Sequence, residues 1–171
     1  LGRLDEAIAS HNKALAINPN FAEGHANLGN ALQDKGEMDK AIASYAKAIA
    51  INPNFAEVHI NLGNALQELG KLDEAIASYQ KALAINPDIA DAHFNLGIAF
   101  REMGKADDAF TCQRRAVTLA PENSMFWDGF ATALQDLSFT GIDEALLDQM
   151  LKLLEQPTVN PSHLVRPIIS A

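Results

Sequence analysis

The sequence predicts an all-α solenoid, in which antiparallel helix hairpins stack on one another. Three observations carry this prediction: prolines recur at a fixed interval, apolar residues between them follow a helical period, and glycines recur between the helical segments. Pro19, Pro53, Pro87 and Pro121 are each separated by 34 residues. A fixed period of this size is typical of repeat arrays, in which each unit buries its apolar face against the next.

Each repeat contains two amphipathic segments. In the first, His59, Leu62, Gly63 and Leu66 are spaced i, i+3, i+4 and i+7, which places them on one stripe of a helix of about 15 residues. The second segment has the same spacing and predicts a helix from Leu72 to Ile85. Its apolar stripe consists of Ala75, Ile76, Tyr79, Ala82 and Leu83.

Glycine recurs at two positions of the repeat, and a polar residue recurs at a third. Gly36, Gly70 and Gly104 lie between the two helices, where a left-handed residue is wanted. Gly29, Gly63 and Gly97 lie within the first helix and are expected to let the paired helices approach closely. The segments 20–23, 54–57 and 88–91 resemble capping boxes, with Asn20, Asn54 and Asp88 as expected cap residues.

These columns resemble the tetratricopeptide repeat family, with His25, His59 and His93 in place of its common Trp or Tyr. The resemblance covers a second-helix remnant at 1–21, full repeats at 22–55, 56–89 and 90–123, a degenerate capping repeat at 124–157 and the start of a further helix at 158–171. It implies a right-handed superhelix that binds proteins or peptides in a concave groove and has no enzymatic activity.

The Asn-Leu-Gly runs at Asn27, Asn61 and Asn95 are also similar to the repeat region of O-linked N-acetylglucosamine transferases. In that family, inward-facing asparagines hold the backbone of an extended peptide. If the first helix of each repeat lines the groove, helical spacing turns a ladder of side chains inward. The expected groove residues are Asn27, Asn30, Gln33, Asn61, Asn64, Gln67, Asn95 and Arg101, with Ile98 between the last two.

A primary amide carries both donors and acceptors, so such a ladder can hold a peptide main chain without reading its side chains. The alternative interpretation is that exposed asparagines only keep the helix soluble. Asp34, Glu68 and Glu102 add acid to the same helices, which favours a basic or neutral peptide. A clamp for a C-terminal carboxylate needs Lys or Arg beside the asparagines, but Ala26, Ile60 and Phe94 precede them.

Composition excludes several other functions. The formal charge of −9 argues against nucleic acid, and no run reaches the about 20 apolar residues of a membrane span. Cys112 is the single cysteine and is expected to be structural, which suits the cytoplasm. The three repeated histidines are about 10 Å apart at helix-packing distance and are expected in the core, so no metal, cofactor or catalytic site is predicted.

The C-terminal repeat departs from the pattern, since Ala131 replaces the paired glycine and the turn at 138–141 differs. It is expected to cap the array, with Phe126, Trp127, Phe130 and Phe139 in its core. The first eight residues read like the middle of a repeat, and the helix after Asn160-Pro161 has no clear partner, so both ends are expected to continue in a longer protein.

Two functions are therefore predicted. The first is a scaffold that binds a protein or extended peptide in its groove, either alone or as the substrate-recruiting region of a transferase or methyltransferase whose catalytic domain is absent here. The second is self-assembly into a homo-oligomer by end-to-end packing. It rests on the expectation that an unpaired first helix exposes Leu4, Ile8 and Leu15.

Overall fold

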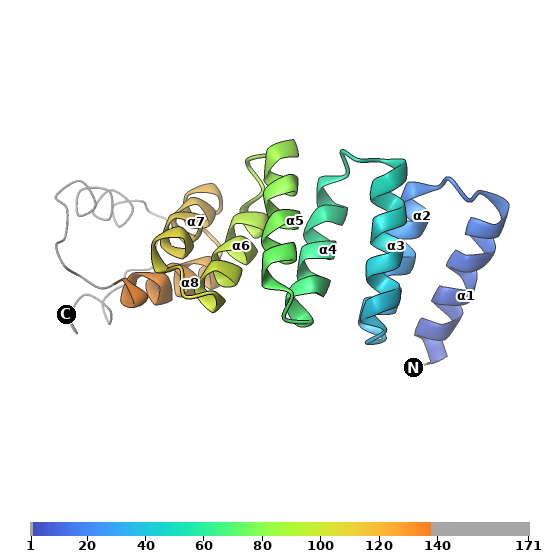
Figure 1. Cartoon of the computed structure of the whole chain (residues 1–171), viewed down its shortest axis with the longest axis horizontal. Helices are drawn as coiled ribbons and strands as arrows, with labels where there is room; N and C mark the ends of the chain where they lie inside the picture. Colours follow the sequence, from blue (N-terminus) through green and yellow to red (C-terminus); the bar gives the residue numbers. More distant parts are fainter. Residues whose placement is uncertain (1, 138–171) are drawn as a thin grey trace. The chain divides into compact units, whose positions relative to one another are not determined.

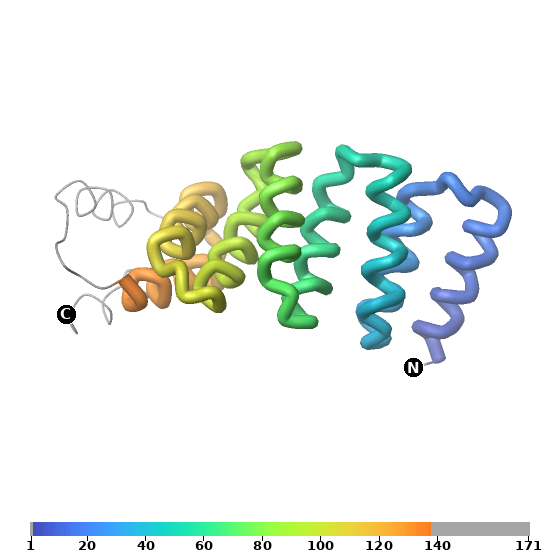
Figure 2. The backbone as a smooth tube through the Cα atoms, viewed as in Figure 1, coloured from blue at the N-terminus to red at the C-terminus, as the bar shows by residue number. Residues whose placement is uncertain are grey.

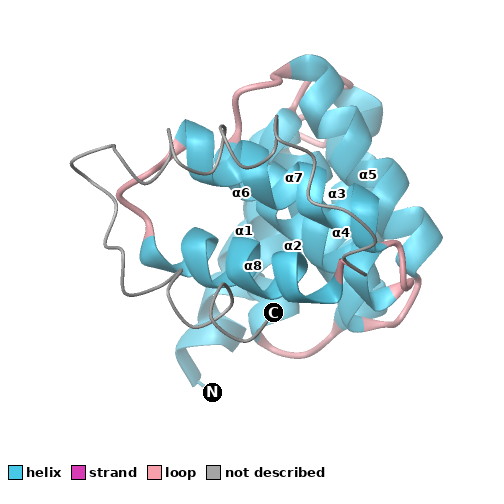
Figure 3. Cartoon of the chain, turned by 90° about the vertical axis from the view of Figure 1, so that its left-hand side faces the viewer, coloured by secondary structure: helices cyan, strands magenta, loops and turns pink. Residues whose placement is uncertain are grey.

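A computed structural model describes residues 2–137 and contains eight helices in that range (Figure 1). The chain divides into two compact units, the first ending at Pro87 and the second beginning at Asp88. The first unit holds α1 (Gly2–Ile17), α2 (Ala22–Asp34), α3 (Met38–Ile51), α4 (Ala56–Glu68) and α5 (Leu72–Ile85). The second holds α6 (Ala90–Glu102), α7 (Ala106–Leu119) and α8 (Ser124–Asp136). This part of the chain has no β-strand (Figure 3), which confirms the predicted all-α solenoid class.

The first unit consists of hairpins that run up and down in the order of the sequence (Figure 2). Helix α2 packs on α3, and α4 packs on α5. Helix α3 also contacts α4, while α2 contacts α4 directly, so the first helices of successive hairpins lie on a common side. This arrangement brings the polar side chains of α2 and α4 within reach of one another.

A glycine ends the first helix of each hairpin. Gly36, Gly70 and Gly104 have φ values of 81°, 71° and 72°, which a side chain with a Cβ rarely adopts. The Gly36 N–H donates to the Gln33 carbonyl at 2.8 Å, and the next N–H, of Glu37, reaches back to Leu32 at 2.8 Å. This pair of bonds is a Schellman motif, and it turns the chain tightly into the second helix.

The predicted capping boxes are wrong. The residues at the N-caps of α2 and α4 are Phe21 and Phe55, whose side chains cap nothing. The asparagine before each proline acts instead: Asn18 Oδ1 accepts from the Asn20 N–H at 3.2 Å, and Asn52 Oδ1 accepts from Asn54 in the same way. The polar residues therefore shape the turn between hairpins rather than the helix start.

The core of the first unit is built on the small-residue columns. Ala41, Ala48 and Ala65 are completely buried, and Tyr45 between them is also completely buried. A Cβ on Gly63 would lie 2.5 Å from Cε1 of Tyr79. The predicted close approach at the paired glycines is thus confirmed, and its reason is specific: the glycine makes room for a tyrosine ring from the second helix.

The prediction that the first helix is unpaired and exposes its apolar stripe is wrong. Helix α1 packs on α2, Leu15 is only 9% exposed, and Ile8 is half-buried against the same core cluster. Lys35, after α2, also bridges to α1 through a 2.7 Å salt bridge to Asp5. The large apolar residue that α1 does expose is Ile17, at 86%.

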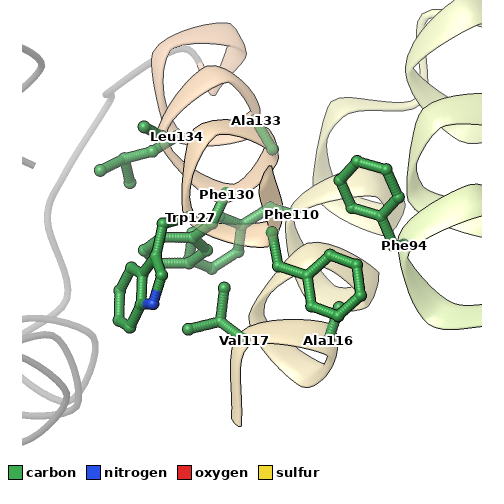
Figure 4. Close-up of a cluster of buried hydrophobic side chains, with 10 residues drawn as sticks. Phe94, Phe110, Ala116, Val117, Trp127, Phe130, Ala133 and Leu134 are labelled. Carbon is green, nitrogen blue, oxygen red and sulfur yellow. The ribbon is translucent and has the colours of Figure 1, made fainter. Parts of the chain in front are cut away.

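The second unit has an aromatic core (Figure 4). Phe94 and Phe126 lie with ring centroids 5.0 Å apart, and Trp127 meets Phe130 edge to face at 6.0 Å. Phe126, Trp127 and Phe130 are therefore core residues, as predicted. Phe139, the turn at 138–141 and the expected helix after Asn160-Pro161 lie outside the described residues.

Candidate functional site: an amide network on the first helices

The predicted groove residues fall in both units, which are described separately. In the first unit, Asn27 is exposed, and the other five are half-buried: Asn30, Gln33, Asn61, Asn64 and Gln67. In the second unit, Asn95 is half-buried and Arg101 is exposed. Within the first unit the structure brings Asn30, Gln33 and Asn61 together in one network.

Tyr45 of α3 lies at the centre of this network. Its hydroxyl is 2.8 Å from Asn30 Oδ1 and 2.9 Å from Gln33 Oε1, both on α2. A hydroxyl carries one proton, so it donates to one of these two oxygens at a time. The bonds fix the amides of Asn30 and Gln33 in orientation, because the tyrosine ring itself is locked in the core.

The network crosses from one hairpin to the next through two further bonds. Asn61 Nδ2 donates to Asn30 Oδ1 at 3.0 Å, and Gln33 Nε2 donates to Glu68 Oε1 at 2.8 Å. Both bonds join α2 to α4. They therefore hold successive first helices in register across the surface that was predicted to line the groove.

The same geometry recurs one repeat later. The Tyr79 hydroxyl of α5 is 2.8 Å from Asn64 Oδ1 and 2.9 Å from Gln67 Oε1. Sequence reasoning assigned Tyr45 and Tyr79 to packing only and missed their polar role. The signal that could have found it is their recurrence at the same 34-residue interval as the amides.

Part of the amide capacity remains available after the network is formed. Asn27 is exposed and makes no hydrogen bond within residues 2–137. Asn61 Oδ1 and Asn30 Nδ2 likewise have no partner in this described part of the chain. The surface thus presents one complete amide, one oriented acceptor and one oriented donor, a mixture that matches the C=O and N–H groups of an extended peptide.

The electrostatics of these two helices are one-sided. Helices α2 and α4 carry Glu23, Asp34, Glu57 and Glu68, all exposed, and neither contains a Lys or Arg. Burial raises the pKa of Tyr45, and the nearby charges of Asp34 and Glu68 raise it further. The tyrosine hydroxyl therefore keeps its proton and remains a donor to the amides.

In the second unit, different side chains occupy the positions of the network. Gln113 stands in the tyrosine column, and its Nε2 donates to the main-chain oxygen of Phe94 at 3.1 Å. Gln113 is 3% exposed, and its buried Oε1 has no hydrogen-bond partner among residues 2–137. A hollow of about 230 Å³ lies beside it, lined also by Gly97, Ile98, Arg101 and Gly129.

Two of the three repeated histidines, His25 and His59, are structural, whereas His93 is only half-buried. His25 Nε2 donates to the Pro19 carbonyl at 2.9 Å, and His59 Nε2 donates to Pro53 at 3.0 Å. Trp127 occupies the same column and donates its indole N–H to Pro121 at 2.8 Å. His25 and His59 are buried, as predicted, and the imidazole reproduces the hydrogen bond that the indole makes.

No group of His, Cys, Asp or Glu within residues 2–137 could hold a metal ion. Burial, together with the charge of Asp108, raises the pKa of the Cys112 thiol to about 11. The thiol is thus protonated at neutral pH, which fits the predicted structural role. Among the helices that the structure describes, none is long and apolar enough to cross a bilayer.

Comparison with family models gives matches along most of the described chain. A model described as "TPR repeat" matches residues 1–36, 29–70 and 63–104, and one described as "Tetratricopeptide repeat" matches residues 90–123. A comparison with curated proteins gives no match.

Solved structures share the fold over two thirds of the chain or more. The crystal structure of MamA is 25% identical, with a TM-score of 0.76, and covers 99% of this chain and 91% of that one. YrrB, described as a TPR protein with an unusual peptide-binding site, is 22% identical with a TM-score of 0.74, covering 96% and 83%. The first TPR of Spaghetti (RPAP3), bound to the HSP90 peptide SRMEEVD, is 24% identical with a TM-score of 0.65, covering 67% and 90%. At these identities the last two likenesses speak for the fold alone.

Proposed function

Because the chain belongs to the tetratricopeptide repeat family, we propose that it is a non-catalytic scaffold that holds an extended segment of a partner protein against its first helices. The observation that carries this proposal is the amide network of α2 and α4. It orients Asn30 and Asn61 while leaving one donor, one acceptor and the whole amide of Asn27 for a ligand. Pre-oriented groups bind better, because less conformational freedom is lost on binding.

The partner segment is recognised mainly through its main chain and is basic. Amides on a repeat spacing offer donors and acceptors to any sequence, as in the asparagine ladder of the O-linked N-acetylglucosamine transferase repeats, which these runs resemble. Four exposed carboxylates on α2 and α4, with no cation on either helix, favour Lys and Arg in the ligand. We infer that the scaffold acts in the cytoplasm.

The test is binding of the intact chain to an array of unrelated short peptides that differ in net charge. We expect binding to peptides of many sequences, strongest for basic ones. Joint substitution Asn27→Ala, Asn61→Ala and Asn95→Ala should weaken it by about tenfold to a thousandfold, since each lost hydrogen bond contributes about 0.5–1.5 kcal/mol.

A matched control uses three exposed asparagines outside the predicted ladder. Asn12→Ala, Asn20→Ala and Asn54→Ala together change the same chemistry at the same number of sites. Binding should survive in this variant. Equal loss in both variants, or equal binding by both, would show that the ladder is not the binding surface. Light scattering across concentrations addresses the self-assembly alternative, which predicts a mass that grows with concentration.

A further inference from the structure

The second unit replaces four of the five side chains of the network, the three amides and the phenol, at matching positions. Moving forward by two repeat intervals converts Asn30, Gln33, Tyr45 and Asn61 into Ile98, Arg101, Gln113 and Gly129. The replacements line the hollow of about 230 Å³. The hollow therefore occupies the place where the first unit has a hydrogen-bonded cluster of amides and a phenol.

Its existence follows from the size of the side chains. Gln113 is shorter than tyrosine and folds against Gly97, where a Cβ would lie 2.8 Å from its Nε2. It cannot reach the space that the tyrosine hydroxyl fills in the first unit. Gly129 adds no side chain where Asn61 supplies an amide, so the volume between α6 and α8 stays open.

The walls of this hollow, which we call the α6–α8 pocket, favour an apolar occupant with an acidic neighbour. Phe94, Ile98, Ala133 and half-exposed Met125 supply apolar surface. Arg101 and Asp128 both lie exposed at the same pocket, and within residues 2–137 Arg101 forms no ion pair. A guanidinium in this position prefers a carboxylate, which it binds through two parallel N–H groups.

We propose that the α6–α8 pocket is an anchor site that takes one large apolar side chain of a peptide ligand, with an adjacent Asp or Glu of that peptide paired to Arg101. This inference rests on the proposed function and adds to it. The proposed amide ladder does not read side chains, whereas the pocket of the second unit would select one. Burial of one such side chain should improve affinity by on the order of tenfold to a hundredfold.

The experiment is selection of a random peptide library displayed on phage against the intact chain. We expect the selected peptides to share one apolar position next to an acidic one. Arg101→Gln should abolish the preference for the acidic neighbour and leave the apolar position enriched. Selected peptides without any common apolar position would overturn the proposal.

Two further variants fill the pocket in different ways. The triple variant Ile98→Asn, Arg101→Gln and Gln113→Tyr copies the first unit, where the same side chains pack and bond. Thr132→Phe fills the pocket from its wall and removes only a local hydroxyl bond to the Asp128 carbonyl, so it stands in if the triple variant does not fold. Either folded variant should select peptides without the apolar position. Retention of the wild-type consensus would refute the anchor.

The outcomes separate this inference from the function on which it rests. Failure of the wild-type chain to select any peptide defeats the proposed function. Selection that depends on Asn27 and Asn61 but not on the pocket defeats only the anchor. Concentration-dependent association that Thr132→Phe abolishes would make a second copy of the chain the occupant, and the proposal would be wrong.

Discussion

The hydroxyl of Tyr45 links packing to polar chemistry at a single residue. The ring fills the gap left by Gly29, and its oxygen emerges among the amides of Asn30 and Gln33. One side chain thereby fixes both the distance between two helices and the orientation of the groups on their surface. The paired glycine and the tyrosine depend on each other, since neither has a role here without its partner.

Tyr45→Phe should lower the free energy of unfolding by about 1–3 kcal/mol, because Gln33 Oε1 loses its donor, Asn30 Oδ1 keeps only the bond from Asn61, and little apolar contact is removed. Denaturant unfolding followed by circular dichroism measures the change. The control is the same substitution in a chain that already carries Asn30→Ala and Gln33→Ala. In that chain the hydroxyl has no amide oxygen to which it can donate. A loss in the free energy of unfolding as large as in the wild-type chain would therefore contradict the network.

Much of this residue-level detail could be predicted, and the failures have physical reasons. The left-handed glycines and buried histidines follow from columns that tolerate few residue types. The hydrogen bonds between tyrosine and the amides were missed because packing alone explains why tyrosine recurs at this position. The position of the hydroxyl group relative to the amides cannot be read from the sequence. The capping boxes were wrong because the N-cap of each helix lies one residue later than predicted, at Phe21 and Phe55, and the side chains of Asn18 and Asn52 bond within the turn before it.

At the scale of elements, a small cluster of charges joins α1 to the turn between α2 and α3. Lys35 forms salt bridges of 2.7 Å to Asp5 and 2.9 Å to Glu37, and Lys40 bonds to Glu37 at 2.6 Å. Sequence reasoning left α1 unpaired, since its partner contacts depend on pairs that lie about 30 residues apart. The structure shows that Leu15 and this cluster attach it to α2.

The cluster predicts a specific acid sensitivity. Hydrogen bonds from Lys40 and then Lys35 lower the pKa of Glu37 to about 2, from 4.5 in the unfolded chain. The folded-state pKa is depressed, so the stabilising contribution is fully present above pH 4.5 and is lost as the pH falls towards 2. Glu37→Gln should therefore lower stability at neutral pH slightly and reduce the loss of stability across that acidic window.

Denaturant midpoints measured on both sides of the window test this expectation. Glu74→Gln is a suitable control, because Glu74 is exposed and forms no salt bridge with another described residue. A Glu37→Gln chain that loses as much stability in acid as the wild type would count against the cluster.

At the scale of the whole molecule, the charge of −9 acts together with the local acid on α2 and α4. Both attract a basic ligand, and attraction between exposed charges is screened by salt over about 10 Å at 0.1 M and about 3 Å at 1 M. The all-α repeat class could be predicted from the 34-residue interval together with the helical spacing of the apolar residues within it. The division at Pro87 and the hollow beside Gln113 could not, since they depend on how individual side chains fill space.

Binding of a lysine-rich peptide should weaken as salt is raised, mainly through slower association, whereas binding of a neutral peptide should change little. Surface plasmon resonance at low and high salt separates the two rates. Salt-independent binding of the lysine-rich peptide would remove the electrostatic part of the proposed function while leaving the amide ladder untouched.

The turns before α2 and α4 are chemically the same, with Asn-Pro-Asn-Phe at 18–21 and again at 52–55. The hydrogen bond from the third residue to the first asparagine therefore forms in both turns. A gene that gained or lost one whole repeat at this turn would encode a chain in which the new turn has the same sequence as the old one. The length of the binding surface can then change by one repeat at a time, because the added repeat uses the same turn between hairpins.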